Sequence, residues 1–553
     1  MRLRLALPLV VLCMLLPACS ANDDTIGCDV VAGQNDINPL DRSEIRDGGN
    51  LRLSLTGFPE NFNALNVDGN NAEIAKILWA IMPRAYSVDA TAALTINTDY
   101  FTDIALTNEN PQQVTYTINP KAVWSDGTPI TWEDLQSQGA ALSGATEGYR
   151  FATTNGFDRV EKIERGVDDR QAIITFKQHY AEWRGQFSGN AMLYPKAVTA
   201  TPEAFNTSLL NDIPLTAGPF VVKNIDKTQN RITLGRNPLW WGATPKLDSI
   251  TFIVLEDSAL VQSLQNDEID AADLRTVDDL RGTQDVSGLE VRCALENEFT
   301  HITFNGAPGS ILNDPKLRVA ISKGINRQEV ADSVHHGIVE DPTLLNNHIF
   351  LEGQVGYEDN AQPIAFDPEQ ARTELDELGW KLVGDVREKD GRQLEIRNVM
   401  YKSDYWQQVS SIVQQDLADI GVRLIIDPFP GEGFFPDVVI PGRFDLANFR
   451  WVGDAFPLAS LPQIYAYNPD DLQSNFGRIG SPEINALIEQ AIAELDPVKA
   501  NELANKVDRL VFEEGFSIPL VQSPGNVGIR ASVANFGAPG LASYDYTAIG
   551  FTK

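Results

Sequence analysis

Histidine and cysteine are scarce in this sequence, and the motifs of the common hydrolases are missing from it. Only five histidines and four cysteines occur among 553 residues. No cysteine pair has the spacing of zinc ligands, and the adjacent residues His335 and His336 cannot share one face of a helix. The patterns G-x-S-x-G, S-x-x-K and H-E-x-x-H do not occur, and neither does a glycine-rich phosphate loop. We therefore expect no metal, no cofactor and no enzymatic activity.

Basic residues are also few. There are 44 Lys and Arg against 76 Asp and Glu, which gives a formal net charge of -32 at pH 7. A surface with this charge repels phosphate backbones and acidic lipid headgroups. We therefore expect no binding to nucleic acid and no electrostatic binding to a membrane surface.

One uncharged apolar run, residues 5–18, stands at the N-terminus behind two arginines. It is too short to span a bilayer, because a spanning helix needs about 20 apolar residues. A charged start, a short apolar run and a small last residue define a secretory signal. The tetrapeptide Leu16-Pro17-Ala18-Cys19 resembles the bacterial lipobox, in which the cysteine carries lipid such as palmitate. We predict a signal peptide over 1–18 and lipidation at Cys19, with a plain secretion signal and a chance cysteine as the alternative.

Two further cysteines, Cys28 and Cys293, remain in the exported chain. In an oxidising compartment such a pair favours one disulfide, and two free thiols are the alternative. Cys28 lies in a polar, turn-rich segment, residues 19–47, which we interpret as a flexible tether between membrane and domain. A disulfide would pin this segment to the body of the protein.

The pattern of the first half of the chain predicts mainly strands, with a few helices. Alternating leucines over 51–55 predict a strand, and residues 74–81 have the apolar spacing of a helix. A turn at Asp126-Gly127 precedes a helix that we expect to begin at Thr131, with Asp134 as its capping partner.

The second half is richer in helices. The pairs Asp314-Pro315, Asp367-Pro368 and Asp496-Pro497 each predict a helix start, because aspartate caps a helix and proline suits its first turn. A helical stripe over 409–420 is followed by a strand over 422–426. Helices that alternate with strands indicate mixed α/β lobes, and the length suits three or four domains or two large lobes.

Six stretches follow one another along the chain: YTINPKAVWSDGTPITWEDL, TAGPFVVKNIDKTQNRITLGRNPLWWG, ITFNGAPGSILNDPKLRVAISKGINRQEV, FDPEQARTELDELGW, IVQQDLADIGVRL and GFSIPLV. In this order they resemble the peptide/nickel class, family 5, of the extracytoplasmic solute-binding proteins of bacterial ABC importers. The resemblance covers roughly residues 48–530.

The resemblance implies an α/β fold of the periplasmic-binding-protein type (type II, cluster C). In this fold two lobes are joined by crossing strands and close around a ligand. Lobe 1 would comprise residues 48–300, with 89–214 as an extra subdomain, and would be completed by 516–553. Lobe 2 would comprise residues 305–515.

The resemblance also implies a function. The chain would be the lipid-anchored solute-binding component of an ABC importer on the outer face of the cell membrane. As a monomer, it would capture peptides by lobe closure and deliver them to a membrane permease, beside which the anchor keeps it. A non-peptide solute binder of the same fold and an envelope-assembly or regulatory lipoprotein that has lost transport are alternatives. An exported hydrolase is a third, since carboxylates are too abundant for a catalytic pair to be singled out.

The strongest candidate for ligand binding is the stretch RWVGDAFP. Peptide-binding members of the family have a Trp-x-x-Asp stretch here, whose aspartate holds the α-ammonium group of the peptide. The resemblance therefore implies Asp454 as the amine anchor and Trp451 as a wall of the cleft. The family often has a second acid before the proline, where this chain has Phe456. The alternative is that Asp454 only caps its loop.

Weaker candidates lie elsewhere. Asn61, Phe62 and Asn63 follow the first strand, where the family's cleft begins, although an ordinary turn rich in Asn and Pro is the alternative. Tyr401 stands where some peptide binders contact the carboxyl end of the ligand. Asn305 follows a presumed crossing strand and would lie at the hinge.

Overall fold

The computed structural model describes residues 27–284 and 286–553. The predicted signal peptide and Cys19, the predicted lipidation site, lie outside the described residues. Among the helices of the described part, none is long and apolar enough to cross a membrane.

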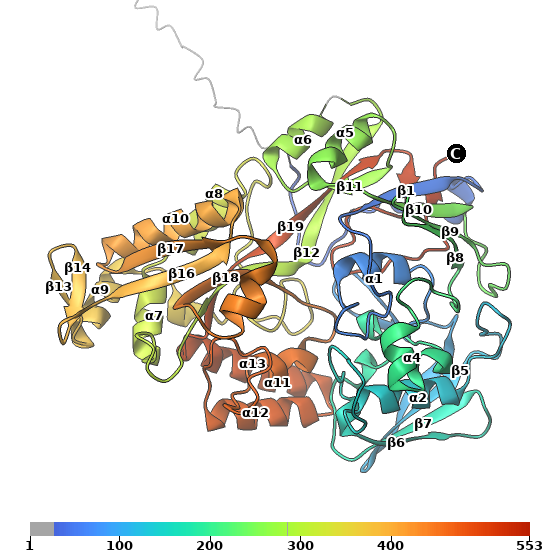
Figure 1. Cartoon of the computed structure of the whole chain (residues 1–553), viewed down its shortest axis with the longest axis horizontal. Coiled ribbons are helices and arrows are strands. Elements are labelled where there is room, and N and C mark those ends of the chain that lie inside the picture. Colours follow the sequence, from blue (N-terminus) through green and yellow to red (C-terminus); the bar gives the residue numbers. More distant parts are fainter. Residues whose placement is uncertain (1–26, 285) are drawn as a thin grey trace, which may run out of the picture.

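A ten-stranded sheet runs through the whole molecule, in the order β17-β16-β18-β12-β19-β11-β1-β10-β9-β8. Its two central strands, β12 (Leu289–Phe304) and β19 (Ser517–Arg530), are long and antiparallel and join the two halves of the molecule (Figure 1). One half holds β11 (Ala271–Asp273), β1 (Asn50–Leu55), β10 (Ser249–Val254), β9 (Arg231–Arg236) and β8 (Phe220–Asp226). The other holds β18 (Leu446–Val452), β16 (Glu395–Tyr401) and β17 (Arg423–Phe429).

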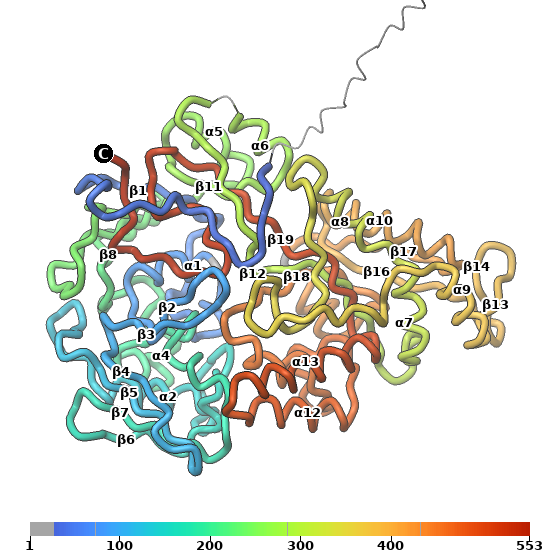
Figure 2. Tube along the Cα trace, turned by 180° about the vertical axis from the view of Figure 1, so that it is seen from behind, coloured from blue at the N-terminus to red at the C-terminus, as the bar shows by residue number. Residues whose placement is uncertain are grey.

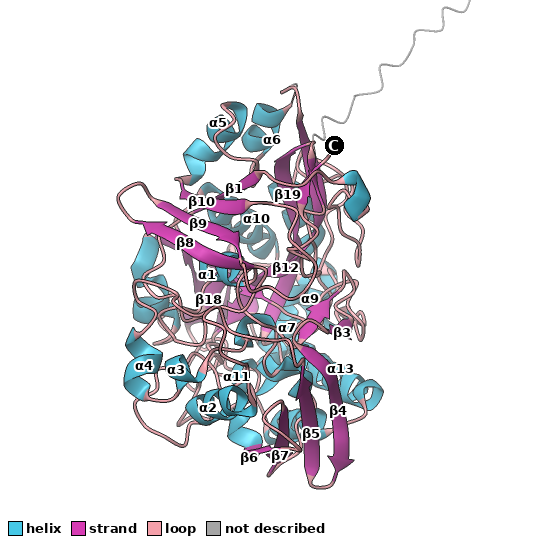
Figure 3. Cartoon of the chain, turned by 90° about the vertical axis from the view of Figure 1, so that its right-hand side faces the viewer, coloured by secondary structure: helices cyan, strands magenta, loops and turns pink. Residues whose placement is uncertain are grey.

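A separate four-stranded sheet stands apart from the main sheet in the first half (Figure 3). It consists of β4 (Phe101–Glu109), β5 (Gln112–Ile118), β7 (Gln171–Phe176) and β6 (Val160–Arg165). Helix α2 (Trp132–Leu142) contacts β6 and β7. It begins after Thr131, where Thr131 and Asp134 form the capping box that the sequence predicts.

Helices of the second half begin at the predicted caps. The side chains of Asp314, Asp367 and Asp496 accept backbone N–H groups at the starts of α7 (Pro315–Lys323), α9 (Pro368–Glu377) and α13 (Pro497–Glu513). Helix α10 (Asp404–Asp419) packs on β16 and β17, and α12 (Pro482–Ala493) packs on α13. Each proline stands at a first helical position, where its missing N–H leaves no bond unmade.

Buried apolar side chains form two main clusters. The first draws on residues 51–294 and 527–551, and the second on residues 302–521. Both central strands contribute to each cluster, because the boundary between the clusters crosses them. We call the two parts lobe 1 and lobe 2.

The segment before β1 is not a free tether. Ile45 is completely buried and pairs with Thr552, while Asp36 pairs with Ala538. Figure 2 shows this N-terminal segment beside the C-terminal end of the chain. The prediction of a flexible tether over 19–47 was therefore wrong for residues 28–47, because bonds and contacts with the last residues of the chain hold them.

A disulfide fixes the start of the same segment. Cys28 is joined to Cys293 in β12, with 6.1 Å between their Cα atoms. Residues 27–47 are therefore attached to lobe 1 at both ends.

Candidate functional site

A cavity lies where lobe 1 faces the loop that follows β18 of lobe 2. Its lining includes Leu65, Asn155, Tyr180 and Ser188 from lobe 1, and Asp454 and Phe456 from lobe 2. Since both lobes contribute walls, a ligand held here would contact both of them at once. This cavity is our candidate functional site.

Asp454 supplies a carboxylate to this cavity. Its Oδ1 accepts the backbone N–H of Phe456 at 2.7 Å, and the side chain is still accessible to solvent. Among the described residues, no cation forms an ion pair with it. The surrounding protein raises its pKa, since removal of water disfavours the charged form. Asp454 therefore caps its loop with one oxygen and has the other free for a ligand.

The loop that carries Asp454 is tied to two other segments. Gln354 donates from its side-chain amide to the carbonyl oxygen of Asp454 at 3.0 Å. Asn297 in β12 donates to the carbonyl oxygen of Gly453 at 2.9 Å, and the N–H of Gly453 donates back to the carbonyl oxygen of Asn297. The position of Asp454 thus depends on the hinge strand and on the loop that contains Gln354.

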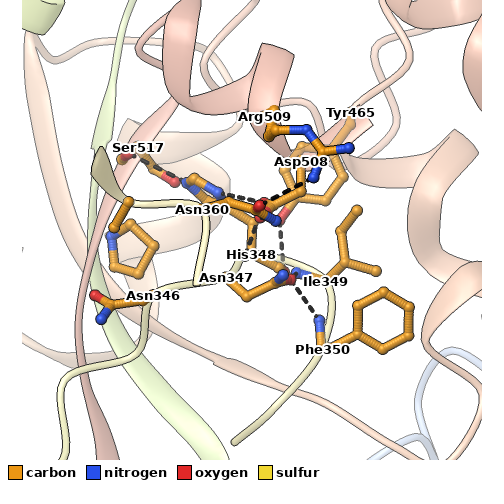
Figure 4. A network of polar contacts seen from close by, with 12 residues as sticks. Asn346, Asn347, His348, Ile349, Phe350, Asn360, Tyr465, Asp508, Arg509 and Ser517 are labelled. Atoms are coloured by element: carbon orange, nitrogen blue, oxygen red, sulfur yellow. Dashed lines mark hydrogen bonds and ion pairs between the residues drawn. The ribbon is translucent and has the colours of Figure 1, made fainter. Parts of the chain in front are cut away.

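A buried polar network anchors that loop to α13 and β19 (Figure 4). The Nδ1 of His348 lies 2.8 Å from Oδ1 of Asp508, and its Nε2 lies 3.2 Å from the carbonyl oxygen of Ser517. The other carboxylate oxygen of Asp508 accepts from Asn360 at 2.8 Å. Asp508 is completely buried, so its bonds are protected from water and hold residues 348–360 in place.

The two lobes touch beside the cavity. Glu182 of lobe 1 accepts the backbone N–H of Leu458 at 3.1 Å. Arg159 of lobe 1 forms an ion pair with Glu489 of α12 at 2.9 Å. These two contacts join the lobes beside the cavity.

The ring of Phe456 fills the gap between the lobes. It is almost completely buried, and a Cβ at Gly185 would lie only 3.1 Å from its ring. Glycine at this position of lobe 1 lets Phe456 of lobe 2 approach the backbone. The aromatic residue in RWVGDAFP thus packs at the lobe interface.

Trp451 does not line the cavity. Its indole ring stacks between His301 and Phe476, with ring centroids 5.8 Å apart in both pairs. The side chain is half-buried, and Leu541 from the C-terminal segment packs in the same cluster. Trp451 therefore supports the strand that leads to Asp454 and is not a wall of this cavity.

Asn61, Phe62 and Asn63, which the sequence analysis predicts to line the cleft, do not line this cavity. All three are buried in lobe 1. Asn61 accepts the N–H of Asn63 at 3.0 Å, and Asn63 donates to the carbonyl oxygen of Phe205 at 2.7 Å. They build a turn, and the two residues that follow it, Ala64 and Leu65, line the cavity.

Asn305 and Tyr401 are also occupied within lobe 2, and neither lines the cavity. The side chain of Asn305 is buried and donates to the carbonyl oxygens of Gly442 and Phe444 at 3.0 and 2.8 Å. The ring of Tyr401 packs on Phe434, with centroids 4.3 Å apart. Bonding and packing inside lobe 2 therefore use both side chains, and the structure does not bring them to the cavity of Asp454.

A second group of charged side chains lies along the hinge. Glu298 of β12 is 3.6 Å from Arg450 of β18 and accepts from the hydroxyl of Ser523 at 3.2 Å. Burial and the charges of Glu298 and Asp273 raise the pKa of Glu296 to about 8. In the described part of the chain, no group of His, Cys, Asp and Glu side chains could hold a metal ion.

Sequence reasoning missed Glu182, Tyr180 and Ser188. They lie within the predicted subdomain, far in sequence from RWVGDAFP, and they carry no motif. The sequence has so many acids that only the fold brings Glu182 to the loop of Asp454.

Comparison with known proteins places the chain in a family. Residues 97–472 match the model of the bacterial extracellular solute-binding proteins, family 5. The chain is 53% identical over 553 residues to the oligopeptide-binding protein OppA of Mycobacterium tuberculosis (strain ATCC 25618 / H37Rv), covering 99% of this chain and 93% of that protein.

Solved structures agree on the fold. The periplasmic EDTA-binding protein EppA superposes with a TM-score of 0.84 at 23% identity, covering 95% of this chain and 99% of that one. The oligopeptide-binding protein AppA from Bacillus subtilis, in complex with a nonapeptide, gives a TM-score of 0.76 at 16% identity, covering 92% and 100%. The predicted α/β fold of the periplasmic-binding-protein type is confirmed. The chain belongs to family 5 of the bacterial extracellular solute-binding proteins.

Proposed function

We propose that this protein is the oligopeptide-binding component of an ABC importer. The observation that carries this proposal is the 53% identity, over almost the whole chain, to a protein named for oligopeptide binding. The cavity between the lobes supports it, since it offers a free carboxylate beside apolar and polar walls. A peptide with a free amino terminus has the matching cation.

In this proposal Asp454 binds the α-ammonium group of the peptide. Its Oδ1 keeps the bond to Phe456, while the other oxygen takes the ammonium. Loss of one partner of a desolvated charge pair costs about 2–5 kcal/mol, so this contact would dominate recognition of the amino terminus. No bond of the ligand is made or broken.

Capture occurs by lobe closure, and a permease then recognises the closed shape. The lobes would correspond to residues 48–300 with 516–553, and to residues 305–515. Lipid at Cys19 would hold the protein, as a monomer, at the outer face of the membrane beside its transporter.

Small-angle scattering and calorimetry with defined peptides test this proposal. A peptide with a free amino terminus should bind and should lower the radius of gyration. Binding of a sugar or a metal complex in place of every peptide would contradict it. A stable protein partner with no solute-induced compaction would instead favour the envelope-assembly alternative.

A further inference from the structure

Residues 27–33, at the start of the described chain, contact both lobes. Gly27 lies against the main chain of Ile338, in the part of the chain that forms lobe 2, since an added Cβ would collide with that carbonyl group. Cys28 is bonded to Cys293 in the lobe 1 part of β12. Figure 2 shows this start of the chain beside β12 and β19, where the two lobes join. We call residues 27–33 the strap.

The strap meets the loop that positions Asp454. Gly33 and Gly353 approach each other closely, since a Cβ added to Gly353 would lie 2.8 Å from the Cα of Gly33. Glycine permits this approach of two main chains, and the two residues have positive φ angles of 72° and 85°. Gly353 precedes Gln354, whose side chain donates to the carbonyl oxygen of Asp454 at 3.0 Å. One peptide bond therefore separates the strap contact from the residue that holds the Asp454 loop.

The loop 351–354 is held by its own turn and by contacts from outside. Gln354 closes the turn, because its Oε1 accepts the N–H of Leu351 and its backbone N–H donates to the carbonyl oxygen of Leu351, both at 3.1 Å. From outside, the N–H of Glu352 donates to Gln522 of β19 at 3.0 Å, and the strap packs on Gly353. Loss of the strap leaves the bond to β19 in place, so the loop loosens without unfolding.

The disulfide holds the strap at its start. The backbone bonds that join the N-terminal segment to the end of the chain begin at Asp36, which pairs with Ala538. The strap precedes these bonds, and Cys28 links it to β12. Cys28 is partly exposed, whereas Cys293 is only 7% exposed. A thiolate from solution therefore reaches the sulfur of Cys28.

We propose that the strap is a redox-sensitive positioning element. While the disulfide between Cys28 and Cys293 is intact, the strap contacts Gly353 and keeps Gln354 bonded to the loop of Asp454. Reduction of the disulfide releases the strap and weakens peptide binding. This inference rests on the proposed function, because the affinity that changes is that for a peptide.

A dithiol is the class of reductant that fits this site. One thiolate of the dithiol attacks the sulfur of Cys28, and the S–S bond breaks so that Cys293 leaves and takes up a proton. The second thiol of the reductant then displaces Cys28 from the mixed disulfide, and Cys28 also ends as a thiol. The protein gains two electrons and two protons, and the dithiol becomes a cyclic disulfide.

The experiment measures peptide affinity by calorimetry on the full chain, before and after reduction with dithiothreitol, and on Cys28→Ser. The ligand is the sequence retained most strongly by the oxidised protein from a random pentapeptide pool. Reduction and Cys28→Ser should each lower the affinity about fivefold, the value of one lost hydrogen bond. In Gln354→Ala the bond to Asp454 is already absent, so reduction should change the affinity by less than about twofold.

Ile45→Ala is the matched control. Ile45 is completely buried in the same N-terminal segment, beyond the strap. Its loss should lower the melting temperature, because a buried side chain is removed, and should leave the peptide affinity unchanged. The control separates the position of the strap from general stability.

Hydrogen exchange without peptide tests the link from disulfide to loop by itself. Reduction and Cys28→Ser should each speed the exchange of the Gln354 N–H about fivefold or more, since the loop opens more often. Ile45→Ala should leave that rate unchanged.

Unchanged exchange at 351–354 after reduction would overturn the inference. An equal fall in affinity on reduction of the wild type and of Gln354→Ala would also overturn it, because the disulfide would then act by another route. If the oxidised wild type binds no peptide while reduction still speeds exchange of the loop, the proposed function fails and the link between strap and loop stands.

Discussion

The side-chain amide of Gln354 donates to the main-chain carbonyl oxygen of Asp454 at 3.0 Å. This bond connects the cavity to the polar network around His348 and Asp508, which lies in the interior of lobe 2 (Figure 4). The loop that carries Asp454 is thus held by a chain of contacts that begins at the buried Asp508 of α13.

Removal of the Asp454 carboxylate should weaken binding of peptides with a free amino terminus by about 2–5 kcal/mol. Asp454→Ala loses both the free oxygen and the cap on Phe456. Asp454→Asn is the matched control, because it keeps an acceptor for Phe456 while it removes the charge. Calorimetry with free and N-acetylated forms of one peptide measures the effect; equal affinity of the wild type and both variants for the free form would contradict the assignment.

Gln354→Ala should weaken peptide binding by about 1 kcal/mol, because one hydrogen bond that positions the loop is lost. The folded protein should keep its stability, since Asn297 still holds Gly453. Thermal unfolding and calorimetry on the same sample separate the two effects. A large drop in melting temperature would show instead that Gln354 stabilises the whole lobe.

Asp508→Ala should lower the free energy of unfolding by about 3–5 kcal/mol, since it leaves the buried Nδ1 of His348 without its partner and removes one of the two acceptors of the Asn360 amide. Urea denaturation measures this. Asp376→Ala is a suitable control, because that carboxylate pairs with Arg387 but is half-exposed. A similar small loss in both variants would mean that the buried network contributes little.

Loss of the disulfide should destabilise lobe 1. Cys28→Ser removes a link that spans 265 residues, and removal of a native disulfide typically costs about 2–5 kcal/mol. Residues 34–47 should stay folded, because Ile45 and Asp36 keep their partners in the C-terminal segment. Hydrogen exchange reports on that segment; full exchange of residues 34–47 in the variant would show that the disulfide alone holds it.

Local signals in the sequence predicted much of the fold. Asp314, Asp367 and Asp496 each precede a proline, and each caps a helix because capping depends only on neighbouring residues. The order of the family motifs likewise led to the correct fold.

The site was less predictable, because it depends on contacts between distant segments. Asn61 and Asn63 have the residue types of a ligand-binding loop, yet they bond to their own lobe. No sequence motif marks Glu182, because its contact between the lobes is with the backbone N–H of Leu458, 276 positions away in the sequence. The prediction of a flexible tether failed for the same reason, because Asp36 and Ile45 pair with residues near the C-terminal end of the chain.

Native mass spectrometry of the protein, purified without refolding, tests the central claim most directly. The account predicts that the wild type releases a series of peptide masses. It also predicts that peptides with free amino termini are missing from the series that Asp454→Ala releases. A single non-peptide mass that leaves with the wild type and with the variant alike would contradict it.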